Sequence, residues 1–231
     1  MVDHPEIYRS QADNYEALVS REDYQHHLLP AIQSITPLNG MSIVELGAGT
    51  GRLTTMLAPL AAHISAFDIS DHMLALTREK LLASGLENWV VNTGEHQYID
   101  INDHSVDLVI SGWSVCYAVV KDQVTDHAAF DRVLSEITRV LKPGGFVILI
   151  ETMGTGFTAP HPPDHLLEYF NLLRLSGFTE TWIRTDYRFE DRLTAERLSS
   201  FFFSNDIIQK LVVSDGEVYL PECTGIWWKR I

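Results

Sequence analysis

Three glycines and two carboxylates within residues 45–68 are the part of this chain best suited to hold a polar ligand. Gly47, Gly49 and Gly51 follow Glu45 at two-residue spacing, after an apolar run. Glycines lack a Cβ atom, so a ligand can approach the main chain, and amide groups at the start of a following helix can hold it. A carboxylate at a strand end suits ammonium or hydroxyl groups. These residues predict a binding site, although glycines at such a position can also serve only to turn the chain.

Asp68 is the second carboxylate, seventeen residues after Gly51 and at the end of another apolar run. An acidic side chain there can accept hydrogen bonds from both hydroxyls of a ribose. Ser70 predicts a helix cap, and an aspartate just before a helix is often only a cap or turn residue. A dinucleotide-binding turn would need a third glycine where Arg52 stands. The pattern therefore favours a nucleoside ligand over a dinucleotide.

A parallel sheet would bring these strand ends to one edge. Short apolar runs predict strands over residues 41–46, 63–67, 89–92, 108–111 and 146–150. Helices are expected over residues 50–58, from Ser70 to near Gly85, and from Thr125 to a break at residues 142–145. Strands that alternate with helices are typical of a doubly wound α/β fold.

Residues 44–51, which end in Gly-x-Gly-x-Gly, resemble the cofactor loop of class I S-adenosylmethionine (SAM)-dependent methyltransferases. The resemblance covers about residues 41–150 by motif. It implies a seven-stranded, mostly parallel sheet with an antiparallel last strand, helices on both faces and an N-terminal helical cover. It also implies SAM as cofactor and methyl transfer to an acceptor. The family commonly has Gly-Asp-Ala after the third strand, where this chain has Gly94, Glu95 and His96, so contact with adenine could be direct or through water.

The resemblance places the cofactor on the glycine turn, the following strand ends and one N-terminal aromatic residue. The expected cofactor residues are Tyr15, Glu45, Gly47, Ala48, Gly49, Gly51, Asp68, Ile69, Met73, Glu95, His96, Ser111 and Trp113. The substrate-side candidates are Tyr8, His26, Cys116, Tyr117, Glu151, His161 and His165. Core packing is the alternative role for the methionine and the aromatic members of both sets.

The sequence assigns no catalytic residue. A methyl group on a sulfonium is already activated, so such an enzyme mainly aligns the acceptor and excludes water. Many relatives carry a histidine pair where this chain has Cys116 and Tyr117. A hydroxyl or acid acceptor would need a base, and the candidates by location are His26, His27, Glu151, His161 and His165.

The chain is interpreted as a single domain, residues 1–231, in three parts. Residues 1–40 show helical spacing of apolar residues and predict the cover, and residues 41–150 form the SAM-binding core. Residues 151–231 form the substrate side, with a loop over 151–163, helices over 166–176 and from Thr194, and strands over 180–188 and 225–229. His161 and His165 lack the spacing of a helical metal site, so no metal is expected.

Composition limits the partners. The chain has 231 residues, 45% of them hydrophobic, and a formal net charge of -14. An acidic surface repels phosphates, which disfavours a nucleic acid and favours a small-molecule acceptor. There is no apolar run of about 18 residues and no signal-like start, so a cytoplasmic protein without a membrane span is expected. Two other functions stay open: a non-catalytic SAM-binding or partner protein that retains the fold, and an NAD-dependent oxidoreductase, which Arg52 disfavours.

Overall fold

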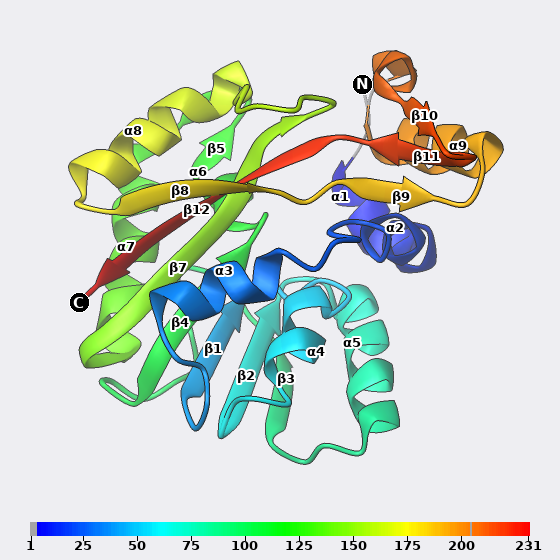
Figure 1. Cartoon of the computed structure of the whole chain (residues 1–231). Helices are drawn as coiled ribbons and strands as arrows, with labels where there is room; N and C mark the ends of the chain where they lie inside the picture. The colour runs from blue at the N-terminus through cyan, green and yellow to red at the C-terminus, as the bar shows by residue number, and fades with distance from the viewer. Residues whose placement is uncertain (1–3, 204) are drawn as a thin grey trace.

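A seven-stranded sheet forms the centre of the protein (Figure 1). The computed structural model describes residues 4–203 and 205–231, so residues 1–3, on which the expected lack of a signal segment partly rests, lie outside it. The strand order is β3-β2-β1-β4-β7-β12-β8. The strands are β1 (Ser42–Leu46), β2 (His63–Asp68), β3 (Trp89–Thr93), β4 (Val106–Gly112), β7 (Leu141–Thr155), β8 (Thr179–Arg184) and β12 (Glu222–Arg230). The first five pair in parallel and β12 is antiparallel to both β7 and β8, which confirms the predicted fold class.

Helices cover both faces of this sheet (Figure 1). One face carries α3 (Leu28–Ile35), α4 (Arg52–Leu57) and α5 (Asp71–Ser84), and the other carries α6 (Val115–Val119), α7 (His127–Val140) and α8 (Leu167–Leu175). Successive residues of a strand point to opposite faces. Ile43 accordingly packs in the cluster with α3, α4 and α5, whereas Val44 packs in the cluster with α6, α7 and α8. The uniformly apolar strands of the sequence are thus explained by burial on both sides.

Local signals in the sequence fix where the main helices begin and end. The Ser70 hydroxyl accepts a hydrogen bond from the Met73 amide at 3.3 Å, and Asp126 accepts one from the Ala129 amide at 3.0 Å. Such caps satisfy amide groups that have no partner inside the helix. The helix α5 ends at Gly85, whose φ of 70° lies in the left-handed region that glycine adopts without strain.

Two short N-terminal helices form the expected cover. They are α1 (His4–Ser10) and α2 (Ala12–Val19), and they lie against α5 and against α9 (Arg192–Phe202). The Ser70 hydroxyl donates to the Tyr8 carbonyl at 2.7 Å, and Lys80 forms an ion pair with Glu16 at 2.6 Å. These contacts fasten the cover to the helix that follows Asp68.

A small antiparallel sheet stands beside the main one, and the sequence did not predict it. It consists of β9 (Tyr187–Phe189), β11 (Glu217–Leu220) and β10 (Val212–Ser214). Its buried side chains Phe189 and Val218 pack with Leu18 of α2 and Leu198 of α9. The remaining elements are the hairpin strands β5 (Val120–Lys121) and β6 (Val124–Thr125) and the 3-10 helices η1 (Asp164–Leu166) and η2 (Asn205–Lys210). No helix in the described part of the chain is long and apolar enough to cross a membrane.

Three sequence predictions about the second half of the chain were wrong. Residues 151–163 were expected to be a loop, but β7 continues to Thr155 because β12 pairs with it. Residues 142–145 were expected to separate a helix from a strand, but they lie within β7, whose register with β4 shifts there. Residues 180–188 were expected to be one strand, but the chain changes sheets between β8 and β9. Each error comes from pairing with a distant segment.

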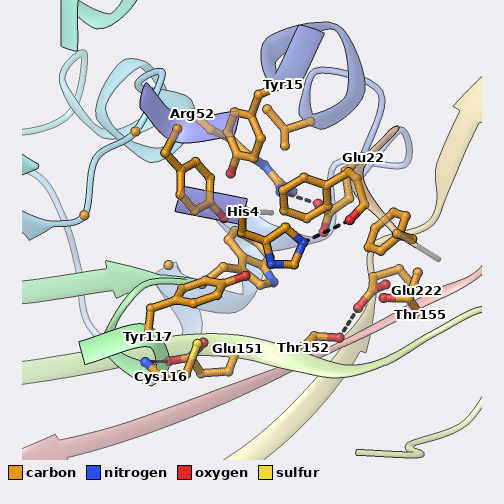
Figure 2. Close-up of a pocket in the computed structure, with 18 of the residues that line it drawn as sticks. His4, Tyr15, Glu22, Arg52, Cys116, Tyr117, Glu151, Thr152, Thr155 and Glu222 are labelled. Carbon is orange, nitrogen blue, oxygen red and sulfur yellow. Dashed lines mark hydrogen bonds and ion pairs between the residues drawn. The ribbon is translucent and has the colours of Figure 1, made fainter. Parts of the chain in front are cut away.

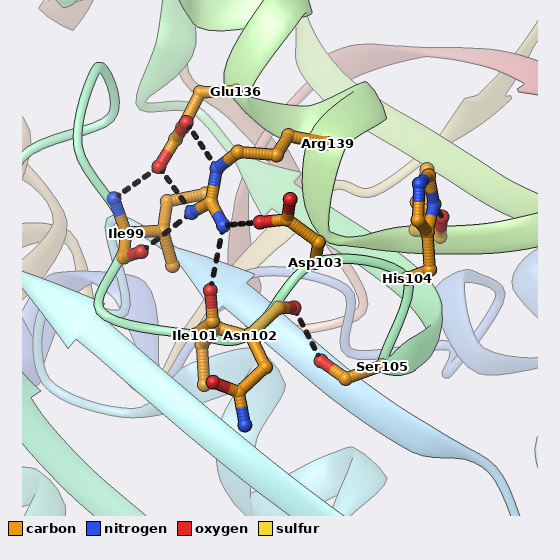
Figure 3. A network of polar contacts seen from close by, with 9 residues as sticks. Ile99, Ile101, Asn102, Asp103, His104, Ser105, Glu136 and Arg139 are labelled. Atoms are coloured by element: carbon orange, nitrogen blue, oxygen red, sulfur yellow. Dashed lines mark hydrogen bonds and ion pairs between the residues drawn. The ribbon is translucent and has the colours of Figure 1, made fainter.

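A network around Arg139 of α7 fixes the loop between β3 and β4 (Figure 3). Its guanidinium donates to the carbonyl oxygens of Ile99 and Ile101, each at 2.8 Å, and pairs with Asp103 and Glu136. Glu136 also accepts a hydrogen bond from the Ile99 amide at 2.7 Å. Charge-assisted bonds of this kind hold backbone firmly, so the segment that follows His96 has a defined position.

Candidate active site

Two adjoining cavities lie near the carboxyl ends of the parallel strands. We call the larger one, of about 400 Å³, the glutamate cavity, because Glu22, Glu45, Glu151 and Glu222 line it. We call the other, of about 350 Å³, the Asp68 cavity. The residues that line both are Tyr8, Tyr15, Gly47, Gly49, Gly112, Trp113 and Tyr117. The two cavities therefore meet at the glycine turn.

The three glycines of the turn have different physical reasons to be glycine. A Cβ atom on Gly47 would lie 1.8 Å from Ser114 Oγ, and one on Gly51 would lie 2.8 Å from a methyl carbon of Thr77. At Gly49 the nearest atom, Met73 Cε, would be 3.9 Å away. Protein atoms fill the space beside the first and third glycines, whereas the space beside Gly49 opens into both cavities. A ligand could approach the backbone there.

Asp68 fixes the turn from the end of β2. Its Oδ2 accepts a hydrogen bond from the Gly49 amide and its Oδ1 accepts one from the Ser70 amide, both at 2.8 Å. Burial raises the pKa of this carboxyl, and the backbone hydrogen bonds act in the opposite direction. The side chain also lines the Asp68 cavity. Asp68 thus holds the turn and faces a cavity at the same time.

Glu45 is buried at the end of β1, where it was expected. Its Oε2 accepts a hydrogen bond from the Thr54 hydroxyl at 2.6 Å, and the side chain lines the glutamate cavity. Burial raises the pKa of Glu45 to about 8. A positively charged ligand group beside it would favour the ionised form.

Arg52 and Glu22 form a buried ion pair that sequence reasoning missed. Arg52 Nη1 lies 2.6 Å from Glu22 Oε2, which also accepts a hydrogen bond from the Tyr187 hydroxyl at 2.8 Å. The guanidinium lies 4.3 Å from the ring centroid of Trp113. Arg52 Nη2 has no hydrogen-bond partner among residues 4–203 and 205–231. In the sequence Arg52 counted only as a departure from a dinucleotide turn, and no local signal marked Glu22.

Two further carboxylates reach the glutamate cavity from β7 and β12 (Figure 2). Glu151 Oε1 accepts hydrogen bonds from the Cys116 amide at 3.0 Å and the Tyr169 hydroxyl at 3.2 Å. Glu222 Oε1 accepts one from the Thr152 hydroxyl at 2.7 Å. Burial raises the pKa of Glu151 to about 7, and burial together with the nearby Glu22 carboxylate raises that of Glu222 to about 8.

Three tyrosines form the boundary between the cavities, and we call them the tyrosine wall: Tyr8, Tyr15 and Tyr117. The rings of Tyr8 and Tyr15 are 5.5 Å apart and those of Tyr8 and Tyr117 are 6.0 Å apart, both edge to face. Phe202 of α9 packs on Tyr15 with centroids 5.4 Å apart. Tyr117 is the most exposed of the three, at 46%. Aromatic surface therefore closes the site from the side of the N-terminal cover.

Most of the predicted site residues lie on the two cavities. Those that line at least one cavity are Tyr8, Tyr15, Glu45, Gly47, Ala48, Gly49, Asp68, Ile69, Met73, Glu95, His96, Trp113, Cys116, Tyr117, Glu151 and His165. Burial lowers the pKa of His96 to about 4, and its Nε2 lies 2.9 Å from Ser114 Oγ.

Four predicted residues are not brought to the cavities. Gly51 packs against Thr77, and the Ser111 hydroxyl donates to the Leu46 carbonyl at 2.8 Å. His161 stacks on Phe157, with centroids 4.0 Å apart, and His26 lies in the turn before α3. Lining residues that the sequence did not single out include His4, Glu22, Arg52, Thr152, Thr155, Tyr187, Phe202, Phe203 and Glu222. Within the described ranges, no group of three or more His, Cys, Asp or Glu residues could hold a metal ion.

The chain is similar to known proteins over the part that contains the glycine turn. A family described as a methyltransferase domain matches residues 44–149, which span β1 to β7. The demethylmenaquinone methyltransferase of Bacillus cytotoxicus is 30% identical over 155 residues. Over this part, the chain is similar to proteins with a methyltransferase domain. This alignment covers 64% of this chain and only 61% of that relative.

Two other matches extend over more of this chain. An uncharacterized methyltransferase of Staphylococcus carnosus is 25% identical over 211 residues, which cover 89% of this chain and 93% of that protein. The crystal structure of a SAM dependent methyltransferase from Aquifex aeolicus superposes with a TM-score of 0.56 at 17% identity, and covers 87% of this chain and 88% of the other. At that identity the match concerns the fold.

Proposed function

We propose that this protein transfers a methyl group from SAM to a small or medium-sized acceptor in the cytoplasm, with residues 1–231 acting as one domain. The observation that carries the proposal is the open side of Gly49, where the two cavities meet. A cofactor that occupied this space would extend into both cavities. When bound, SAM supplies a methyl group that is already activated on a sulfonium.

The Asp68 cavity suits the nucleoside part of the cofactor. Each oxygen of Asp68 accepts one backbone hydrogen bond and has a second lone pair for a ribose hydroxyl. Ile69, Met73 and Glu95 line the same cavity, where apolar contacts and an acceptor for an adenine amine are needed. In the glutamate cavity, Glu45 would hold an ammonium group and Arg52 Nη2 a carboxylate.

The rest of the glutamate cavity supports acceptor binding. The tyrosine wall, Phe202 and Phe203 line it, and a cavity of about 400 Å³ suits a small or medium-sized molecule. Methyl transfer from a sulfonium needs no metal. The protein therefore contributes mainly alignment of the acceptor. The net charge of -14 disfavours a nucleic acid acceptor.

Calorimetric titration of the full chain with SAM, and separately with NAD, tests the proposal. We expect SAM to bind with a one-to-one stoichiometry and NAD to give no heat of binding. Binding of NAD in preference to SAM would instead assign an oxidoreductase. If neither ligand bound, the chain would be a partner protein that has kept only the fold.

A further inference from the structure

Two buried carboxylates of the glutamate cavity lack full hydrogen bonding. Glu151 is 1% exposed and Glu222 is 2% exposed, and both line the cavity (Figure 2). Among the described residues, neither Glu151 Oε2 nor Glu222 Oε2 has a hydrogen-bond partner of ordinary geometry, although the Cys116 thiol and the Thr155 hydroxyl lie near enough to these carboxyl groups to lower their pKa values. Buried polar atoms are almost always paired, because an unpaired one loses its water without compensation. The two free oxygens therefore indicate hydrogen-bond donors on a ligand.

The charges around the cavity point to a positively charged ligand. Arg52 is the one Lys or Arg among the described residues that line this cavity, and it is paired with Glu22. Glu151 and Glu222 have no cation of their own in the lining. Their raised pKa values are the consequence, since burial without a cation favours the neutral acid. A bound cation would reverse this and leave both carboxylates ionised.

The other walls of the cavity suit the same ligand. The rings of Tyr8, Tyr117, Phe202 and Phe203 line it. Aromatic faces attract cations and also cover apolar groups, so they can hold a protonated nitrogen and the carbon skeleton that bears it. An anionic acceptor would meet two carboxylates, and the cation of the cavity, Arg52, is already paired with Glu22 and assigned to the carboxylate of the cofactor.

We propose that the methyl acceptor is an amine, which Glu151 and Glu222 bind in its protonated form through their free oxygens. The inference rests on the proposed function and assigns it a substrate class, so the reaction is N-methylation. Glu151 stands nearer the tyrosine wall, because its Oε1 binds the amide of Cys116, the residue before Tyr117.

This position makes Glu151 the proton acceptor. The ammonium group first gives one proton to the Glu151 carboxylate, which frees the nitrogen lone pair. The amine nitrogen then forms a bond to the methyl carbon as the carbon–sulfur bond breaks, and the electron pair of that bond stays on sulfur. The nitrogen of the product carries the positive charge, and Glu151 returns its proton to solvent after release. Glu222 holds the remaining N–H groups and orients the lone pair.

Matched ligands test the proposal. The full chain, saturated with S-adenosylhomocysteine, is titrated with three carbon skeletons, phenylethyl, indolylethyl and hexyl, each carrying an amine, an alcohol or a carboxylate. We expect the amine to bind at least about 10-fold more tightly than its two counterparts, the range for a charge-assisted hydrogen bond. An alcohol or carboxylate that binds as well as its amine, or no amine binding at all, would overturn the amine assignment. Failure of S-adenosylhomocysteine itself to bind would overturn the proposed function.

Conservative variants separate the two carboxylates. We expect Glu222→Gln to raise the KM for the best-bound amine about 10-fold, and Glu151→Gln to lower kcat about 100-fold, the usual contribution of a positioned base. Both should bind S-adenosylhomocysteine within about twofold of wild type, because only the acceptor side changes. Glu168→Gln, on an exposed residue of α8 paired with His127, is the matched control and should change neither constant. Unchanged kinetics in both cavity variants would contradict the proposal.

Discussion

The two cavities differ in how far along the chain their residues come from. Apart from two tyrosines of the N-terminal cover, the Asp68 cavity is lined by residues 47–121, whereas the glutamate cavity draws on residues from 4 to 222. The first is encoded by a turn and the strand ends that follow it. The second exists only after β7, β12 and the small sheet have come together. A ligand contact encoded locally can be predicted from sequence, and one assembled from distant segments cannot.

The cavities also differ in how far their carboxylates are satisfied without a ligand. Both oxygens of Asp68 accept backbone hydrogen bonds. Glu151 and Glu222 each leave one oxygen without a partner in the described structure. The Asp68 cavity is therefore preorganised, because the carboxylate that a ligand would contact is already held by backbone hydrogen bonds. In the glutamate cavity, Glu151 and Glu222 would gain a positively charged partner only when a ligand binds.

The buried ion pair between Arg52 and Glu22 lies in the wall of the glutamate cavity, and breaking it should have the largest effect on stability. We expect Arg52→Ala to lower the free energy of unfolding by about 3–5 kcal/mol, because a buried carboxylate loses its cation. Arg21→Ala removes the more exposed pair with Glu190 and should cost less than about 1 kcal/mol. Urea denaturation measures both. Equal losses in the two variants would mean that the buried pair contributes no more to stability than the exposed one.

Filling the space beside Gly49 should remove cofactor binding and leave the fold. Gly49→Ala should weaken SAM binding at least about 100-fold, or about 2.7 kcal/mol, because the methyl group enters the space assigned to the ligand. Gly40 also has a positive φ, 76°, and a Cβ there would meet nothing within 4 Å. Gly40→Ala therefore controls for backbone strain and should bind SAM normally in calorimetry. Equal binding by the two variants would move the cofactor away from the turn.

Removing the Asp68 carboxylate should weaken nucleoside binding by about 1–3 kcal/mol, the cost of losing a charged hydrogen-bond partner. Because Asp68 also holds the Gly49 amide, a loss of affinity alone would not identify a ribose contact. Methylthioadenosine and its 2′-deoxy form provide that distinction in a double-mutant cycle. Wild type should prefer the ribose form and Asp68→Ala should bind the two alike. A preference that survived the substitution would leave Asp68 with only its backbone role.

The pH dependence of stability provides a separate test of the burial of Glu45. The pKa of Glu45 is about 8 in the folded protein, above its ordinary value of 4.5. Between these values the folded protein holds a proton that the unfolded chain has lost, so Glu45 makes stability fall as pH rises. Glu45→Gln lacks this contribution. Its Tm relative to wild type should therefore rise by several degrees from pH 5 to pH 8 in thermal scans. A constant difference would show that Glu45 is ionised throughout.

The fold of the first half was predictable because its signals are local. Apolar runs mark β1 to β4, the glycine turn marks the start of α4, and Ser70 and Gly85 mark the ends of α5. In the second half, the strand at residues 151–155 depends on pairing with β12, about seventy residues later. The Thr and Gly residues of this segment predict a loop, because no nearby part of the sequence supplies the strand that pairs with it.

The same distinction applies to the candidate site. Glu45 and Asp68 stood out through their spacing from the glycines, and the structure places both beside a cavity. Their contacts with SAM stay predictions. Glu22 and Glu222 could be recognised as site residues only from their contacts with Arg52 and Thr152, respectively, which lie far away in sequence. His161 had a suitable residue type and location, yet the fold directs it onto Phe157.

The helix α1 supplies Tyr8 to both cavities, and this has a kinetic consequence. If that helix must lift before either ligand can leave, exchange of the spent cofactor and release of the product share one gate. Turnover then has an upper limit set by the rate of lifting, whatever the reactivity of the acceptor. Acceptors of very different nucleophilicity would converge on one kcat and show burst kinetics in their first turnover. Evolution of a faster enzyme would then proceed through the contact between Tyr8 and Ser70, which fastens α1 to the start of α5.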